Sequence, residues 1–255
     1  MTLVDQFPAE HARLPSRPVC TIFSYTMRAR TTPATRAAKA NDRLSSALAS
    51  GALAKLISYF VVRPDDTPHL RALMRHTAMS ARSFQLEFAR LEQLGLLRRD
   101  VQANGRVLIR TTERRDLWAP FRALVRAYAD PVDLLRLALI DLVGIEAAFV
   151  FGSVAAGTAD DQSDVDLCVI ATAGDDARVE ALERSLAQRT VEASLGIGRE
   201  VNVVVVTAAR LAAKLAAGRG FYPRILAGDK RWVLGDSRAV ARAMHPTARH
   251  RVDAA

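Results

Sequence analysis

The chain has 255 residues, of which 50% are hydrophobic and 25% charged, a composition typical of folded globular proteins. It contains no apolar stretch near the ~20 residues of a membrane span and no signal-peptide pattern, so we expect a cytoplasmic protein with no membrane partner. The five scattered histidines and the differing contexts of Cys20 and Cys168 argue against a zinc site and a structural disulfide.

The formal net charge of +9 is concentrated in the N-terminal half. Residues 1–40 contain six Lys and Arg against two Asp and Glu, residues 41–116 contain thirteen against eight, and residues 117–255 contain seventeen of each. This bias indicates either a solvated basic surface or a polyanion partner for the N-terminal half. Residues 1–40 also contain four prolines and no sustained periodicity, which predicts a disordered basic tail.

Helices are predicted in the first part of residues 41–116. Apolar residues recur at helical spacing from Leu44 to Val62, which predicts one helix there. Thr67, followed by a proline, is expected to cap a short second helix. Ser80 is expected to cap a third helix, which ends near Gly95.

A hairpin is predicted after these helices. Residues 96–100 and 106–110 flank the dipeptide Asn104-Gly105, which is a strong signal for a tight turn between two strands. Helix, short turn, helix and hairpin is the order of a winged helix-turn-helix. The segment over residues 41–116 resembles the DNA-binding domains of ArsR- and MarR-like bacterial regulators, particularly in "MSARSFQLEFARLEQLGLLRR".

This resemblance implies a DNA partner for the N-terminal half. The helix after Ser80 would enter the major groove, and the hairpin would meet phosphate or the minor groove. The implied contacts are Ala81, Arg82 and Gln85 on the helix, and Arg106 and Arg110 on the hairpin. Winged helices also dock onto other proteins, so protein binding is the alternative. Binding to palindromic DNA would favour a homodimer.

Residues 117–143 are rich in leucine and alanine at helical spacing, with a break at Asp130-Pro131. Two helices are expected, the second over Val132–Leu142. This helical connector is equally compatible with a linker, a dimerisation element or a part of the following domain.

Beyond residue 143 the pattern changes to strands and helices, and residues 144–240 are expected to form a second domain. Buried strands are predicted at Ile145–Phe151, Asp166–Thr172 and Glu200–Thr207, with a long helix between the last two. The closing segment of this domain contains four apolar residues expected in the core, which are Phe221, Ile225, Leu226 and Trp232. It also contains three basic residues that are expected in solvent or, as the alternative, in contact with phosphate: Arg219, Arg224 and Lys230. Residues 241–255 are expected to be a tail.

The stretch "FVFGSVAAGTADDQSDVDLCVI" carries the chemistry. Asp164 and Asp166 are two apart at the start of a strand, so both face one side, roughly 6.5–7 Å apart. Two such carboxylates suit a common Mg²⁺ or Mn²⁺ ion. Gly152 and Ser153 end the preceding strand and offer backbone N–H groups and a hydroxyl to a phosphate, and Gly157 keeps the following turn close.

Gly152-Ser153, ten residues and then Asp164-Val165-Asp166 resemble the signature of the polymerase-β-like nucleotidyltransferases, and are similar above all to the minimal ones. The resemblance covers about residues 144–236. It implies an α+β fold in which a mixed sheet with flanking helices follows the winged helix. It also implies that the protein binds a nucleoside triphosphate with Mg²⁺ or Mn²⁺ and transfers the nucleotidyl group to a hydroxyl of a protein or a small molecule.

Two positions depart from this family. Ala156 stands where an arginine is usual, and Asn202 occupies the position of the third catalytic carboxylate, where it can neither carry a charge nor take a proton. Glu200 is the other residue on that strand face that can supply a carboxylate. Two interpretations follow: a nucleotidyltransferase with Asp164, Asp166 and Asn202 at its centre, or a transcription regulator whose impaired domain senses nucleotides.

Overall fold

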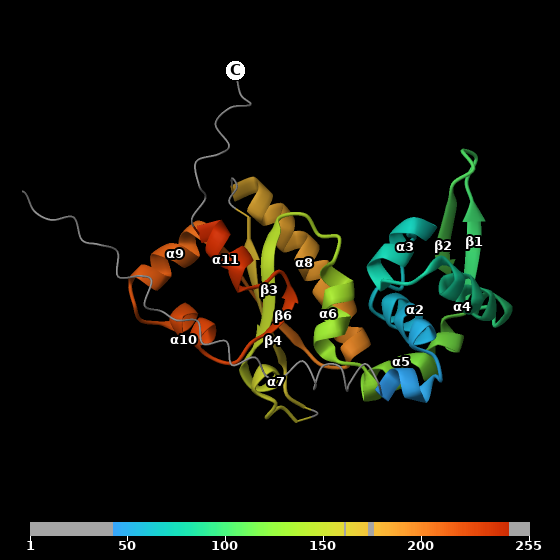
Figure 1. Cartoon of the computed structure of the whole chain (residues 1–255), viewed down its shortest axis with the longest axis horizontal. Helices are drawn as coiled ribbons and strands as arrows, with labels where there is room; N and C mark the ends of the chain where they lie inside the picture. Colours follow the sequence, from blue (N-terminus) through green and yellow to red (C-terminus); the bar gives the residue numbers. More distant parts are fainter. Residues whose placement is uncertain (1–42, 161, 173–175, 245–255) are drawn as a thin grey trace, which may run out of the picture.

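The computed structural model describes residues 43–160, 162–172 and 176–244 (Figure 1). The tail expected over residues 1–40 and residues 245–255 of the second expected tail lie outside the described residues. No helix in the described ranges is long and apolar enough to cross a membrane.

The N-terminal half forms three named helices and a hairpin, after a short helical segment over residues 43–47. These elements are α2 (Gly51–Val62), α3 (Leu70–Thr77), α4 (Ala81–Gln93), β1 (Leu97–Val101) and β2 (Val107–Thr111). The expectation of one helix from Leu44 to Val62 is wrong. Ala49 has a φ of 52°, and the Ser50 hydroxyl accepts the N–H of Leu53 at 3.1 Å, so a new helix begins there.

The helix expected to begin at Thr67 begins at Leu70 instead. The Pro68 carbonyl accepts the N–H of Ile109 at 3.0 Å, and His69 pairs with Leu108, so these residues lie alongside β2 rather than in the helix. The other two predicted helix boundaries are confirmed. Ser80 caps α4, and a glycine with a positive φ, Gly95, follows its end.

The C-terminal half is built on a four-stranded sheet. Its elements, after a 3-10 turn at Arg115–Trp118, are α5 (Ala119–Tyr128), α6 (Pro131–Leu139), β3 (Ile145–Phe151), α7 (Gly152–Ala156), β4 (Val165–Ala171), α8 (Asp176–Ile197), β5 (Val201–Thr207), α9 (Ala208–Ala216), α10 (Phe221–Ala227), β6 (Arg231–Leu234) and α11 (Ser237–Met244). The strand order is β5-β4-β3-β6, with β4 and β5 parallel and the other pairs antiparallel. The predicted mixed sheet with flanking helices is confirmed.

The two faces of this sheet are covered by different helices. On one face, side chains of every second residue of β3 and β4, such as Val150 and Leu167, pack with α6 and α8. The intervening residues, such as Phe149 and Cys168, pack with α9, α10 and α11. Figure 1 shows α9, α10 and α11 on one side of the sheet and α6 on the other. The apolar runs at 147–151 of β3 and 167–171 of β4 are continuous because both faces of these strands are buried there.

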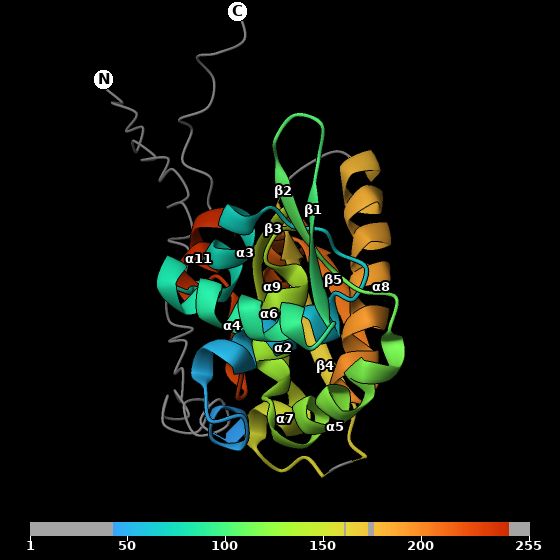
Figure 2. The ribbon, with the colours of Figure 1, turned by 90° about the vertical axis from the view of Figure 1, so that its right-hand side faces the viewer.

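The N-terminal half packs on the helices α6 and α8 through α2, and one continuous apolar core runs from Leu44 to Val233. The approach of α2 to α8 is close at Gly196, where a Cβ atom would lie 2.8 Å from Cγ1 of Val62. Figure 2 shows that the turn of the β1–β2 hairpin and α7 lie at opposite ends of the molecule.

Candidate functional site

The predicted site begins where β3 ends and the chain turns into the short helix α7. Gly152, the first residue of α7, has a φ of 70°, a conformation that glycine adopts without steric cost. A Cβ atom at this position would lie 2.6 Å from Oδ2 of Asp166. The glycine therefore allows the backbone of this turn to lie directly against the Asp166 carboxylate.

Three polar side chains lie together at this end of the sheet. In the register of the strands, Asp166 of β4 is opposite Asn202 of the parallel neighbour β5. The Asn202 amide donates a hydrogen bond of 3.3 Å to Oδ2 of Asp164. Side chains alternate along a strand, so Asp164 and Asp166 share the face that Cys168 presents to α9, α10 and α11. The structure thus brings together the three residues that the sequence places at the catalytic centre.

The electrostatics of the two carboxylates suit a cation. Partial burial and, to a smaller extent, the neighbouring charge of Asp164 raise the pKa of Asp166. A hydrogen bond from Asn202 lowers this pKa. A divalent cation would relieve this repulsion. Two carboxylates and an amide oxygen are hard ligands of the kind that Mg²⁺ and Mn²⁺ prefer, so this donor set fits such an ion.

Within the part of the chain that the structure describes, no third carboxylate joins the pair. Among the described residues, no three His, Cys, Asp or Glu side chains are grouped so that they could hold a metal ion. Glu200, the alternative third ligand, precedes β5 and is exposed. Asn202 therefore occupies the third position beside the two aspartates.

Ser153 and Gly157 shape the turn that follows Gly152. The Ser153 carbonyl accepts the backbone N–H groups of Gly157, Thr158 and Ala159, and Gly157 ends α7 with a φ of 73°. The N–H of Gly157 is thus used within the turn. No hydrogen-bond partner for the half-buried Ser153 hydroxyl is found among the described residues, so it remains available to a ligand.

Two further residues lie near the site, and one of them, Phe221, was not expected there from the sequence. Phe221, expected in the core, is 38% exposed at the start of α10, and its ring contacts that of Phe151. Lys230 precedes Arg231, which pairs with Val150, so it lies at the same end of the sheet as Gly152. Burial lowers the pKa of Lys230, whose ammonium donates to the Gly228 carbonyl at 2.9 Å. For Lys230 the signal was its position in sequence next to β6, whereas nothing in the sequence marked Phe221 as exposed.

The residues predicted to contact DNA lie on the N-terminal half, apart from this site. Arg82 and Gln85 are exposed on α4, and Arg106 is exposed at the hairpin turn. Arg110 forms an ion pair with Asp100 at 2.9 Å.

Two further exposed arginines on the hairpin, Arg98 and Arg99, were not among the predicted contacts. Arg98 is exposed and stands directly across the strands from Arg110. Two like charges facing each other across a hairpin disfavour it unless a counter-charge is present. The signal was the hairpin register, which pairs residues on either side of the predicted turn.

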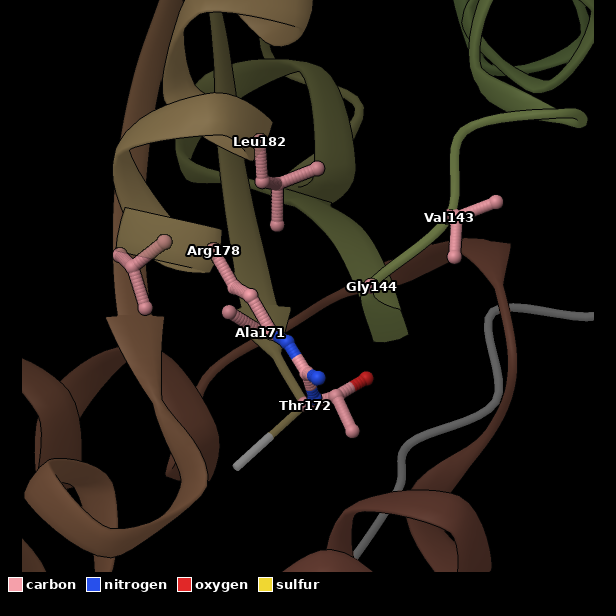
Figure 3. Close-up of a pocket in the computed structure, with 7 residues that line it drawn as sticks. Val143, Gly144, Ala171, Thr172, Arg178 and Leu182 are labelled. Carbon is pink, nitrogen blue, oxygen red and sulfur yellow. The ribbon is translucent and has the colours of Figure 1, made fainter. Parts of the chain in front are cut away.

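A cavity of about 270 Å³ lies at the other end of the sheet (Figure 3). Apolar atoms form most of its wall, and the residues around it are Val143, Gly144, Ala171, Thr172, Arg178, Val179 and Leu182. It contains none of the residues that the sequence predicts for the site, and it lies where β4 ends rather than where β4 begins.

One known family is similar to the C-terminal part of the chain. Residues 132–222 match the family model described as "Nucleotidyltransferase domain". The match begins within α6, ends within α10 and includes Gly152, Asp164, Asp166 and Asn202. A comparison with curated proteins found no match to the chain. The match supports a nucleotidyltransferase domain over residues 132–222 and, in general terms, nucleotidyl transfer.

Proposed function

We propose that the protein binds a nucleoside triphosphate with Mg²⁺ or Mn²⁺ and transfers its nucleotidyl group to a hydroxyl of a protein or a small molecule. The observation that carries this proposal is the convergence of Asp164, Asp166 and the Gly152 turn at one end of the sheet. The nucleotidyltransferase match over residues 132–222 supports it independently.

In this mechanism each residue has a separate task. Asp164 and Asp166 hold the cation, which when bound neutralises the triphosphate and polarises its α-phosphorus. The Ser153 hydroxyl and the backbone of the Gly152 turn orient the phosphates. The acceptor oxygen forms a bond to the α-phosphorus, the bond to the bridging oxygen breaks, and pyrophosphate leaves. Asn202 cannot take the hydroxyl proton, so the proton passes to solvent and we expect slow transfer.

The second candidate function is regulatory. Asn202 in place of a carboxylate, with no three-residue acidic group among the described residues, favours a domain that binds the nucleotide without turnover. In that case the C-terminal half senses nucleotides and the N-terminal half acts on DNA. Both functions need the same cation and triphosphate site.

Two assays separate these functions. The first measures pyrophosphate release from each of the four triphosphates. The second measures transfer of an α-phosphate label to the protein or to small hydroxyl compounds. We expect release and transfer with Mg²⁺ or Mn²⁺, both lost in the Asp164→Ala/Asp166→Ala variant. Tight triphosphate binding without release would reject the transferase and leave the sensor. Release that is unchanged in the double variant would place the chemistry elsewhere.

For residues 41–116 we propose a winged helix-turn-helix that binds DNA, as a homodimer on palindromic sites. Support comes from the order of α3, a three-residue turn, α4 and the β1–β2 hairpin, and from the exposed Arg82, Gln85 and Arg106. The basic excess of this segment favours DNA over a protein partner. Because DNA and nucleoside triphosphates are both cytoplasmic, we place the protein in the cytoplasm.

We expect Arg82→Ala and Arg106→Ala each to weaken binding to a random-sequence DNA duplex. If each arginine contacts a phosphate, each substitution lowers the slope of log affinity against log salt by about one. Fluorescence anisotropy across a salt series measures this slope. Arg238→Ala, which removes an exposed arginine on α11, is the matched control and should leave the slope unchanged. Binding that is insensitive to salt and to both substitutions would instead favour protein docking.

A further inference from the structure

Phe221 is an exposed aromatic residue beside the proposed nucleotide site. It begins α10, and 38% of it is exposed, whereas Pro223 and Leu226 of the same helix are buried. Its ring centroid lies 5.6 Å from that of Phe151 with the planes at 78°, and 5.2 Å from that of Tyr222 at 79°. These edge-to-face contacts hold the ring in place while part of it faces solvent.

The ring lies on the same face of the sheet as the two carboxylates. Phe151, which it contacts, is directly opposite Asp166 in the antiparallel register of β3 and β4. Residues that face each other across an antiparallel pair project to the same side. Figure 1 shows α10 at the end of the sheet where α7 begins. A fixed aromatic surface therefore lies close to the groups that would hold the cation and the phosphates.

This surface has the chemistry of a base-binding site. An aromatic ring held by its neighbours can stack against a nucleobase without first losing conformational freedom. Phe151 immediately precedes Gly152, so the ring that supports Phe221 is continuous with the turn proposed to orient the phosphates. The phosphates and the base of one nucleotide would thus contact adjoining parts of a single surface.

We propose that Phe221 binds the base of the nucleoside triphosphate by stacking and favours purines over pyrimidines. This inference rests on the proposed triphosphate site. The larger purine ring system covers more of an aromatic surface than a pyrimidine does, so it gains more from stacking. Stacking contacts the face of the base and not the hydrogen-bonding groups on its edge, so ATP and GTP are expected to bind with similar affinity.

Calorimetric titration of ATP, CTP and inorganic tripolyphosphate into the whole protein with Mg²⁺ tests this proposal. We expect Phe221→Ala to weaken ATP binding about tenfold to a hundredfold and to leave tripolyphosphate binding unchanged, because tripolyphosphate has no base. Phe221→Leu, which keeps an apolar contact to Phe151, should weaken ATP binding as well. Phe221→Trp should restore it. Tyr128→Ala, at an exposed aromatic residue on α5, is the matched control and should change neither ligand.

Three results would overturn the inference. The first is ATP binding by Phe221→Ala at wild-type strength, which leaves the triphosphate site itself intact. The second is equal weakening of ATP and tripolyphosphate, which indicates damage to the fold around Phe151. The third is failure of the wild-type protein to bind either ligand, which overturns the proposed function together with this inference.

Discussion

Replacing Asn202 with aspartate is expected to raise the rate of nucleotidyl transfer by about 10²- to 10⁴-fold, the usual contribution of a positioned general base. The amide of Asn202 already reaches the Asp164 carboxylate at 3.3 Å, so an aspartate there would complete a three-carboxylate group without moving the backbone. It would supply both a negative charge for the cation and an acceptor for the hydroxyl proton. Pyrophosphate release, measured with saturating Mg²⁺ and ATP, gives the rate.

When no metal ion is present, the Asn202→Asp variant should be less stable than the wild-type protein. A third carboxylate would add to the repulsion that already raises the pKa of Asp166. Its Tm should therefore fall in EDTA and rise more on addition of Mg²⁺ than that of the wild type. Asn202→Ala, which removes the amide without adding charge, is the control and should not be faster. A variant that binds Mg²⁺ by this measure but transfers no faster would show that position 202 does not limit catalysis.

Replacing Arg63 with alanine is expected to destabilise the protein by about 3–5 kcal/mol, the loss found when one partner of a buried ion pair is removed. The Arg63 side chain is 0% exposed at the end of α2, where it pairs with Asp66 at 3.0 Å and with Asp141. It also donates to the Leu137 carbonyl at 3.2 Å and lies over the ring of Tyr59. Alanine would remove the buried guanidinium with its contacts to Tyr59 and the Leu137 carbonyl, and would leave the partly exposed carboxylates of Asp66 and Asp141 without their cation.

Urea denaturation measures the free energy of unfolding of this variant. Arg114→Ala is the matched control, since Arg114 pairs with Asp116 on the surface, where both side chains are more than 60% exposed. That substitution should leave the free energy of unfolding nearly unchanged, because water screens an exposed pair. A loss of similar size in both variants would contradict the role given to Arg63. Because Arg63 connects α2 to α6, the result also tests whether the two halves of the chain unfold together.

Those parts of the fold that local pattern determines could be predicted from the sequence. The run Ile145–Phe151 matches β3 in its bounds, because a strand buried on both faces is a continuous apolar run ended by a glycine. The spacing of Asp164 and Asp166 predicted that they share one face, whereas the place of Asn202 beside them was implied by the resemblance to polymerase-β-like nucleotidyltransferases.

Features that depend on distant contacts could not be predicted. The helix expected at Thr67 begins later because the Pro68 carbonyl bonds to Ile109, about forty residues further along the chain. Phe221 is an apolar residue of the kind that usually lies in a core, and its exposure depends on how α10 meets the end of β3. Periodicity indicates which apolar side chains share one face of a helix or strand, but it does not indicate which residues cover that face.

Metal-dependent nucleotide binding at the two aspartates is the property that the proposed function requires first. Calorimetric titration of ATP into the wild-type protein should show binding with Mg²⁺ that is lost in EDTA and in the Asp164→Ala/Asp166→Ala variant. Binding of equal strength in the double variant, or no binding of any of the four triphosphates by the wild type, would contradict the assignment of this site.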